Sequence, residues 1–140
     1  MNAVSARNEF RREIPATLAA VEDFCIAARR WALSVCLPNR FAAELLTREA
    51  LANAAAHGCG CDSSKHITCV LRLRPGRLII AVRDQGPGFD WRAARARTPD
   101  LDACTGRGID ILRQYAHRLR FNQRGNSLII VKRLKKEGTR

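Results

Sequence analysis

The sequence predicts an α/β (α+β) fold, a two-layer sandwich whose mixed, mostly antiparallel sheet of about five strands is covered on one face by helices. Strand-like and helix-like segments alternate in the order β-α-α-β-β-α-β-β. Glycine-containing turns join two pairs of the strand-like segments as hairpins. The chain has 140 residues, of which 46% are hydrophobic, and this supplies enough apolar surface for one core. We therefore expect a single domain over residues 1–140.

A short strand and an amphipathic helix are expected first. Phe10–Ile14 is predicted to be a strand that Pro15 ends. From Pro15 onward, apolar residues recur at helical spacing as far as Val35, while charged residues fill the opposite face. Proline is suited to the first turn of a helix, because an N–H at that position has no partner within the helix. We therefore place Pro15 in the first turn of this helix.

A second helix is expected over about Arg40–His57. Asn39 precedes it as a plausible N-cap, and Gly58 and Gly60 close it. The many alanines of this segment favour a helix strongly.

The second half of the chain predicts two hairpins and a third helix. Asp84–Gly88 is expected to be a glycine-rich turn, and the arginine-rich stretch Asp90–Thr105 a loop with some helix. A helix should follow from Gly106 to about His117. We expect Lys135–Arg140 to be a frayed basic tail. The four predicted strands of the hairpins are Ile67–Leu73, Leu78–Arg83, Arg118–Asn122 and Ser127–Leu134.

The charge of the chain favours an acidic partner, whether a nucleotide, a nucleic acid or a protein. Lysine and arginine number 25 and aspartate and glutamate 13, which gives a formal net charge of +12. No apolar run approaches the roughly 18 residues of a membrane span, and Met1–Ile14 has no apolar signal core. The six cysteines are then expected to be reduced thiols. We predict a cytoplasmic protein that does not enter a membrane.

The second helix carries two polar residues in an apolar setting. Glu44 and Arg48 form an i,i+4 pair typical of a solvated stripe. Glu49 and Asn53, also four residues apart, lie off that stripe among leucines and alanines. Burying a carboxylate and an amide there is costly unless they face a cleft or a ligand. The alternative is that both lie at the edge of the helix face and bind solvent.

Two glycine motifs add further candidates. Asp84 leaves a strand as an acceptor, and Gly86 and Gly88 let the backbone approach a ligand closely, although the same residues also make a good turn. The segment Gly106–Gly108 opens a helix, whose free N–H groups suit a phosphate. Arg107 adds a charged donor to that segment. The alternative is that these glycines merely end a loop and start a helix.

In their order and context, the three motifs resemble the Bergerat-fold (GHKL) ATPase and kinase superfamily. The chain looks most like the anti-sigma-factor serine-protein kinases of bacterial partner-switching systems. Glu44–Gly58 is similar to the N box of that family, Asp84–Gly88 to its G1 box, and Gly106–Ile109 to its G2 box. The resemblance covers nearly the whole chain.

The resemblance implies ATP and Mg²⁺ as cofactors and assigns three central roles. Glu49 would be the general base for an attacking serine hydroxyl. Asn53 would ligate Mg²⁺. Asp84 would accept a hydrogen bond from the adenine amino group.

The remaining roles concern the base and the phosphates. Gly86 and Gly88 would let the chain pass close to the base, and His57 would reach the phosphate side. The family usually has a threonine in its closing hairpin that supports an adenine-bound water, and Ser127 is the expected substitute here. The phosphates would be held, beneath a lid over about residues 89–105, by Gly106, Arg107 and Gly108.

The resemblance implies a serine-protein kinase that phosphorylates a STAS-type anti-sigma antagonist. It also implies binding to a sigma factor or another output protein, and a homodimer. A nucleotide-dependent sequestering or switch module without kinase activity is the alternative. Direct nucleic-acid binding is not expected, because the recognition helix of a helix-turn-helix near Arg48–Ile67 would contain Ile67–Val70, which prefers a strand. A self-contained histidine kinase is not expected, because these 140 residues leave no room for its phosphoacceptor domain.

Overall fold

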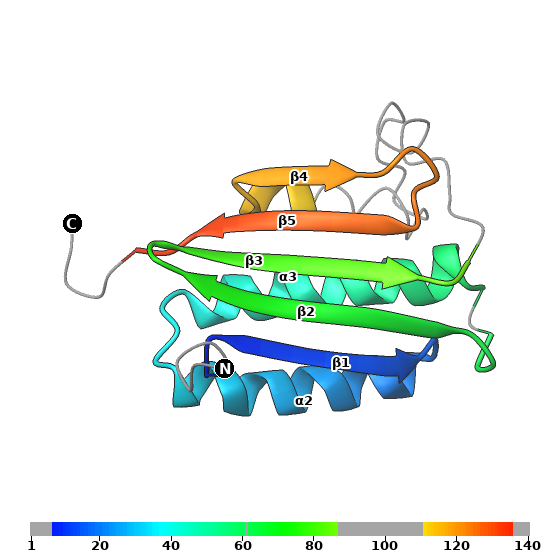
Figure 1. Cartoon of the computed structure of the whole chain (residues 1–140), viewed down its shortest axis with the longest axis horizontal. Coiled ribbons are helices and arrows are strands. Elements are labelled where there is room, and N and C mark those ends of the chain that lie inside the picture. The colour runs from blue at the N-terminus through cyan, green and yellow to red at the C-terminus, as the bar shows by residue number, and fades with distance from the viewer. Residues whose placement is uncertain (1–6, 61, 87–110, 136–140) are drawn as a thin grey trace.

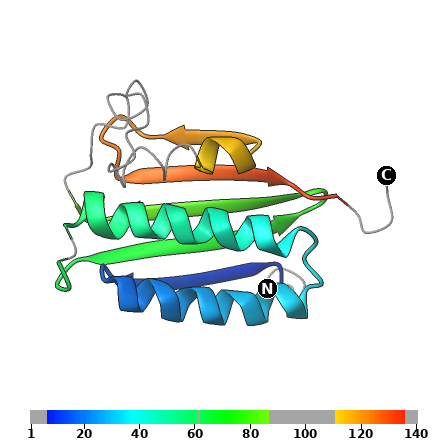
Figure 2. The same ribbon diagram turned by 180° about the vertical axis from the view of Figure 1, so that it is seen from behind.

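The computed structural model describes residues 7–60, 62–86 and 111–135 as two layers, a sheet and a set of helices. Figure 1 looks onto the sheet, and Figure 2 shows the helices from the other side. The strands are β1 (Glu9–Pro15), β2 (His66–Arg74), β3 (Arg77–Asp84), β4 (Arg118–Phe121) and β5 (Ser127–Arg133). The helices are α2 (Leu18–Ser34), α3 (Arg40–Asn53), the π-helical turn η1 (Ala54–Gly58) and a helical turn over residues 111–115.

The five strands form one sheet in the order β1-β2-β3-β5-β4. The predicted two-layer sandwich is confirmed, and the sheet is antiparallel at each of its four described pairings. The two predicted hairpins are also present, with Gly76 and Gly125 at positive φ in their turns. Because β5 lies between β3 and β4, the end of β3 adjoins the β4–β5 turn. Accordingly, the Asp84 N–H donates to the Asn126 carbonyl over 2.9 Å.

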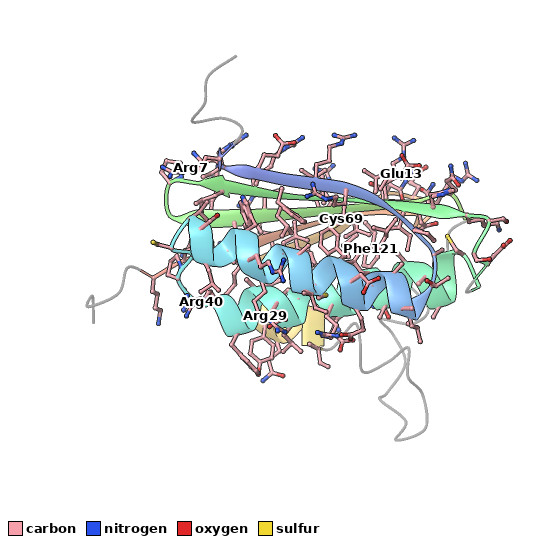
Figure 3. All side chains as sticks on the ribbon, turned by 90° about the horizontal axis from the view of Figure 1, so that it is seen from below. Arg7, Glu13, Arg29, Arg40, Cys69 and Phe121 are labelled. Carbon is pink, nitrogen blue, oxygen red and sulfur yellow. The ribbon has the colours of Figure 1, made fainter. Side chains whose placement is uncertain are left out.

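The core lies between the helices and one face of the sheet. Alternate residues of the central strands point toward the helices, among them Ile67, Ile80 and Ile130, whose exposed fraction is 0%. Figure 3 shows Cys69 and Phe121 between the two layers and Glu13 on the opposite face of the sheet. Each large apolar side chain buried here contributes roughly 1.5–3 kcal/mol to the free energy of folding.

Helix α2 begins later than predicted. Thr17 is its N-cap, and the Thr17 hydroxyl accepts a hydrogen bond from the Ala20 N–H over 3.1 Å. The placement of Pro15 in the first helical turn was therefore wrong. Pro15 ends β1, where it pairs with His66 in the antiparallel register. A proline is tolerated there because β1 is an edge strand.

Helix α3 differs from its prediction at both ends. Asn39 precedes it in a left-handed conformation with φ of 58° and makes no side-chain cap. Its Oδ1 atom instead accepts a hydrogen bond from the Lys135 N–H over 2.9 Å. Lys135 is thus bonded to the start of α3, whereas the sequence predicted it to be part of a frayed tail. At the other end the α-helix stops at Asn53 and continues as η1. Single π turns of this kind occur often at functional sites.

Charged residues join the outer surfaces of α2 and α3. The predicted pair of Glu44 and Arg48 is present, with an N–O distance of 3.7 Å. Both residues also reach α2, because Glu44 pairs with Arg29 at 2.5 Å and Arg48 pairs with Glu22.

Among the residues that the structure describes, no helix is long and apolar enough to cross a membrane.

Candidate functional site

Three of the predicted site residues line one hollow at an end of the sheet. The C-terminal ends of β3 and α3 and the β4–β5 turn come together there (Figure 1). Asn53 comes from α3, Asp84 from β3, and Ser127 from the start of β5. We call this the strand-end hollow. Its lining consists of Ala50, Asn53, Ala54, Val82, Asp84, Phe121, Gly125, Asn126, Ser127 and Leu128.

Asp84 is a buried carboxylate, with 5% of its surface exposed. Asp84 continues the series of every second residue of β3 that is buried, after Leu78, Ile80 and Val82, so its side chain points to the helix side of the sheet. One carboxylate oxygen, Oδ1, accepts a hydrogen bond from the Gly86 N–H over 2.8 Å. Burial raises the pKa of Asp84, and the hydrogen bond from Gly86 and the nearby Cys59 side chain oppose that rise. In the described part of the motif the chain bends at Gln85 and Gly86, and Asp84 is held as an acceptor at the hollow.

Asn53 is buried and incompletely bonded. Only 8% of its surface is exposed, so the reading of Asn53 as a solvated residue at the edge of the helix was wrong. Its Nδ2 atom has no hydrogen-bond partner among the described residues. A buried amide without a partner costs free energy, and such groups are rare in folded proteins. A ligand in the strand-end hollow would supply the missing partner.

Glu49 lies one helical turn before Asn53 on α3. Its side chain is half-buried and does not line the strand-end hollow. Within the described part of the chain, Glu49 makes no hydrogen bond or ion pair, unlike Glu44 on the same helix. The described residues therefore leave its carboxylate without a partner.

Cys59 is a contact of Asp84 that the sequence analysis missed. The η1 turn places the Cys59 N–H 3.0 Å from the Ala54 carbonyl and buries the thiol to 4% exposure. The Cys59 side chain lies beside Asp84 and acts to lower the pKa of that carboxyl. Burial and the charge of Asp84 raise the pKa of the Cys59 thiol.

Asn126 is a second residue that the sequence analysis missed. Its Nδ2 atom donates to the Asp84 carbonyl over 3.4 Å, and its Oδ1 atom accepts from Asn122 Nδ2 over 2.5 Å. Asn122 Oδ1 also accepts from the Ser127 N–H over 3.2 Å. The turn that carries Ser127 is thereby fastened to the end of β3.

Several predicted site residues lie outside the described part of the chain. His57 belongs to η1, but its side chain is not described. Gly86 is described and is buried beside Asp84. The residues that are not described are Gly88, the lid over residues 89–105, Gly106, Arg107 and Gly108.

The strand-end hollow joins two buried polar groups that come from different layers of the fold. A buried acceptor ends the central strand β3, and a buried amide without a partner faces it from α3. A model of the histidine kinase-like ATPase domain matches residues 14–132, and the chain belongs to this family. A comparison with curated proteins found no match. Membership assigns this chain a GHKL-type fold and the binding of ATP.

Proposed function

We propose that this chain is a protein-serine kinase that uses ATP and Mg²⁺ to phosphorylate a STAS-domain antagonist. It would also bind a sigma factor or another output protein and act as a homodimer. One observation carries the proposal: α3 presents two groups that have no partner among the described residues, the Glu49 carboxylate and, one turn later, the buried Nδ2 atom of Asn53. Asn53 would serve the nucleotide site, and the Glu49 carboxylate would accept the proton during phosphoryl transfer.

The residues of the strand-end hollow fit a nucleotide bound with a metal ion. Asn53 lines the hollow and would hold Mg²⁺ through its side-chain oxygen, because this ion prefers oxygen ligands. Asp84 would accept a hydrogen bond from the adenine amino group, and Val82 and Leu128 would contact the base. Mg²⁺ and ATP supply the phosphoryl group and the neutralisation of its charge when they are bound.

Glu49 would act as the general base. Its carboxylate is half-exposed and makes no contact with a described cation, so a serine hydroxyl of a docked substrate can reach it. A general base must lie within about 3 Å of the hydroxyl, directly or through one water. Glu49 takes the hydroxyl proton as the serine oxygen attacks.

A nucleotide-dependent binding module is the second candidate. It is favoured by the absence of Glu49 from the lining of the strand-end hollow, because Asn53 and Asp84 could then bind the nucleotide without phosphoryl transfer. In that case nucleotide binding would change the affinity for an output protein, and no partner would become phosphorylated.

The two candidates are separated by phosphate transfer from labelled ATP to a purified STAS-domain antagonist. We expect Glu49→Gln to lower the rate of transfer by about 100-fold or more, because general-base catalysis contributes at least that much. The affinity for ATP, measured by calorimetry, should change by less than about twofold. Asp23→Asn is the matched control, because Asp23 is an exposed acidic residue of α2.

An unchanged rate of transfer in Glu49→Gln would remove the catalytic assignment. ATP binding without transfer to any antagonist tested would select the binding module. Sedimentation of the protein alone, and of the protein mixed with a sigma factor, tests the proposed homodimer and output partner.

A further inference from the structure

The face of the sheet that points away from the helices is uncovered in the described chain. Residues of this face alternate with the core residues along each strand, and Figure 3 shows Glu13 pointing away from the helices. We call it the open face. Its outward positions on the central strands include Val70 on β2, Ala81 on β3 and Ile129 on β5.

The centre of the open face is apolar. Val70 pairs with Ala81, and Ala81 pairs with Ile129, so these side chains form one row across three strands. Ile79 and Val131 pair in the next row. Val70 is buried, at 6% exposure, although it does not belong to the core cluster, and Ile129 is 44% exposed. The open face thus has its own apolar centre, separate from the core.

Arginines surround this centre on every strand of the sheet. Arg11 pairs with Val70 at one end of the central row, and Arg120 pairs with Ile129 at the other. The face carries two carboxylates, Glu9 and Glu13, both on the edge strand β1, and Glu9 lies 3.9 Å from Arg72. The arginines in the central row or in a row next to it are Arg11, Arg72, Arg83, Arg118 and Arg120, and Arg77 pairs with Arg133 one row further out.

An apolar centre within a charged rim is the usual arrangement of a protein interface, and arginine is enriched in such interfaces. A hollow over the open face is lined by Arg11, Ala81 and Ile129 and continues to Asp84 and Gly86 at the nucleotide end of the sheet. We infer that the open face docks an acidic protein surface, which places apolar side chains on the Val70–Ala81–Ile129 row and carboxylates on the arginine rim. This inference concerns a surface and does not depend on phosphoryl transfer.

Two other occupants fit the open face less well. A second copy of this chain would bring two arginine-rich surfaces together, and like charges across an interface disfavour association. Single-stranded nucleic acid is held largely by stacking on aromatic side chains, and the described outward positions of the strands carry no Phe, Tyr or Trp. Glu9 and Glu13 would also repel phosphates along β1.

The test uses a fluorescent helical peptide with leucines on one face and glutamates on the other, titrated with the full chain. We expect Ile129→Glu and Arg120→Glu each to weaken peptide binding by about tenfold or more, as loss of an interface anchor does. Leu33→Glu and Arg30→Glu are the matched controls on α2, where Leu33 is 52% exposed and Arg30 is exposed, and these should change affinity by less than about twofold. A peptide with glutamine in place of glutamate should bind more weakly to the unmodified protein.

Each contrary result overturns the proposal. The proposal fails if the peptide does not bind to the unmodified protein. It also fails if the open-face variants and the α2 variants lower the affinity for the peptide equally. Tighter binding of duplex DNA or single-stranded RNA than of the peptide, lost in Arg120→Glu, would assign the face to nucleic acid. A dimer in sedimentation that Ile129→Glu dissociates would assign it to a second copy. Unchanged ATP binding in Arg120→Glu shows that the variant is folded.

Discussion

Two stripes of helix α3 use polar residues in opposite ways. On the outer stripe, Glu44 and Arg48 are both paired, with each other and with residues of α2. On the other stripe, Glu49 makes no contact with a described partner, and Asn53 is buried with its Nδ2 atom unbonded. Spacing alone does not distinguish the two pairs, because each is four residues apart. The difference lies in whether the polar groups have bonding partners. The paired groups join α2 and α3, and the unpaired groups, which have no described partner, are the ones that we propose bind a ligand or substrate.

The largest effect that sharpens this comparison is expected from Asn53→Ala. ATP binding should weaken by about tenfold or more, because the residue offered to the metal and phosphates is lost. The free energy of unfolding should change by less than about 1 kcal/mol, because the substitution also removes a buried donor that has no partner. Calorimetry with ATP and urea unfolding measure the two quantities. A large loss of stability with unchanged ATP affinity would make Asn53 a structural residue.

A smaller effect concerns the pH dependence of stability at Asp84. Burial raises the pKa of this carboxyl above its ordinary value of 3.8, so the native state binds more protons than the unfolded state between the two pKa values. The free energy of unfolding therefore falls as the pH rises from below about 4 through the raised pKa. Asp84→Asn should remove this fall. At pH values above the raised pKa of Asp84, the variant should be more stable than the unmodified protein. Urea unfolding at a series of pH values tests this, and equal slopes in both proteins would contradict it.

The smallest effect is expected on the paired stripe. Arg48→Ala removes the contacts with Glu22 and Glu44, but Arg48 is about one-third exposed, at 32% of its side chain. The loss of stability should be no more than about 1 kcal/mol and should shrink as salt is added. ATP affinity should stay within about twofold of the unmodified protein. A larger change in ATP affinity would show that the paired stripe also contributes to ATP binding, and would contradict the distinction between the two stripes.

Local sequence patterns were sufficient to predict most of the fold. Alternate apolar residues of the central strands face the core, and glycine turns placed both hairpins correctly. The errors came where a distant residue decides a local conformation. Pro15 stays in β1 because His66 pairs with it, and Asn39 bonds Lys135 instead of capping α3. A propensity that depends only on neighbours in the sequence cannot include such contacts.

The candidate site was only partly predictable for a similar reason. The motif residues Asn53 and Asp84 do line one hollow, but whether Asn53 is buried depends on the strands packed over α3. Cys59 was missed because η1 adds a π turn after the helix, and this turn changes which side chain faces Asp84. Asn126 was missed because its contact with Asp84 spans two hairpins.

The position of β5 has a consequence for the order in which the protein can form during synthesis. This strand comes late in the chain, yet it occupies an inner place in the sheet and supplies Ile130 to the core. On the ribosome, β3 would therefore expose an unpaired edge until residues 127–133 emerge. The pocket around Asp84 can only be completed at that moment, so nascent chains shorter than this should capture no nucleotide.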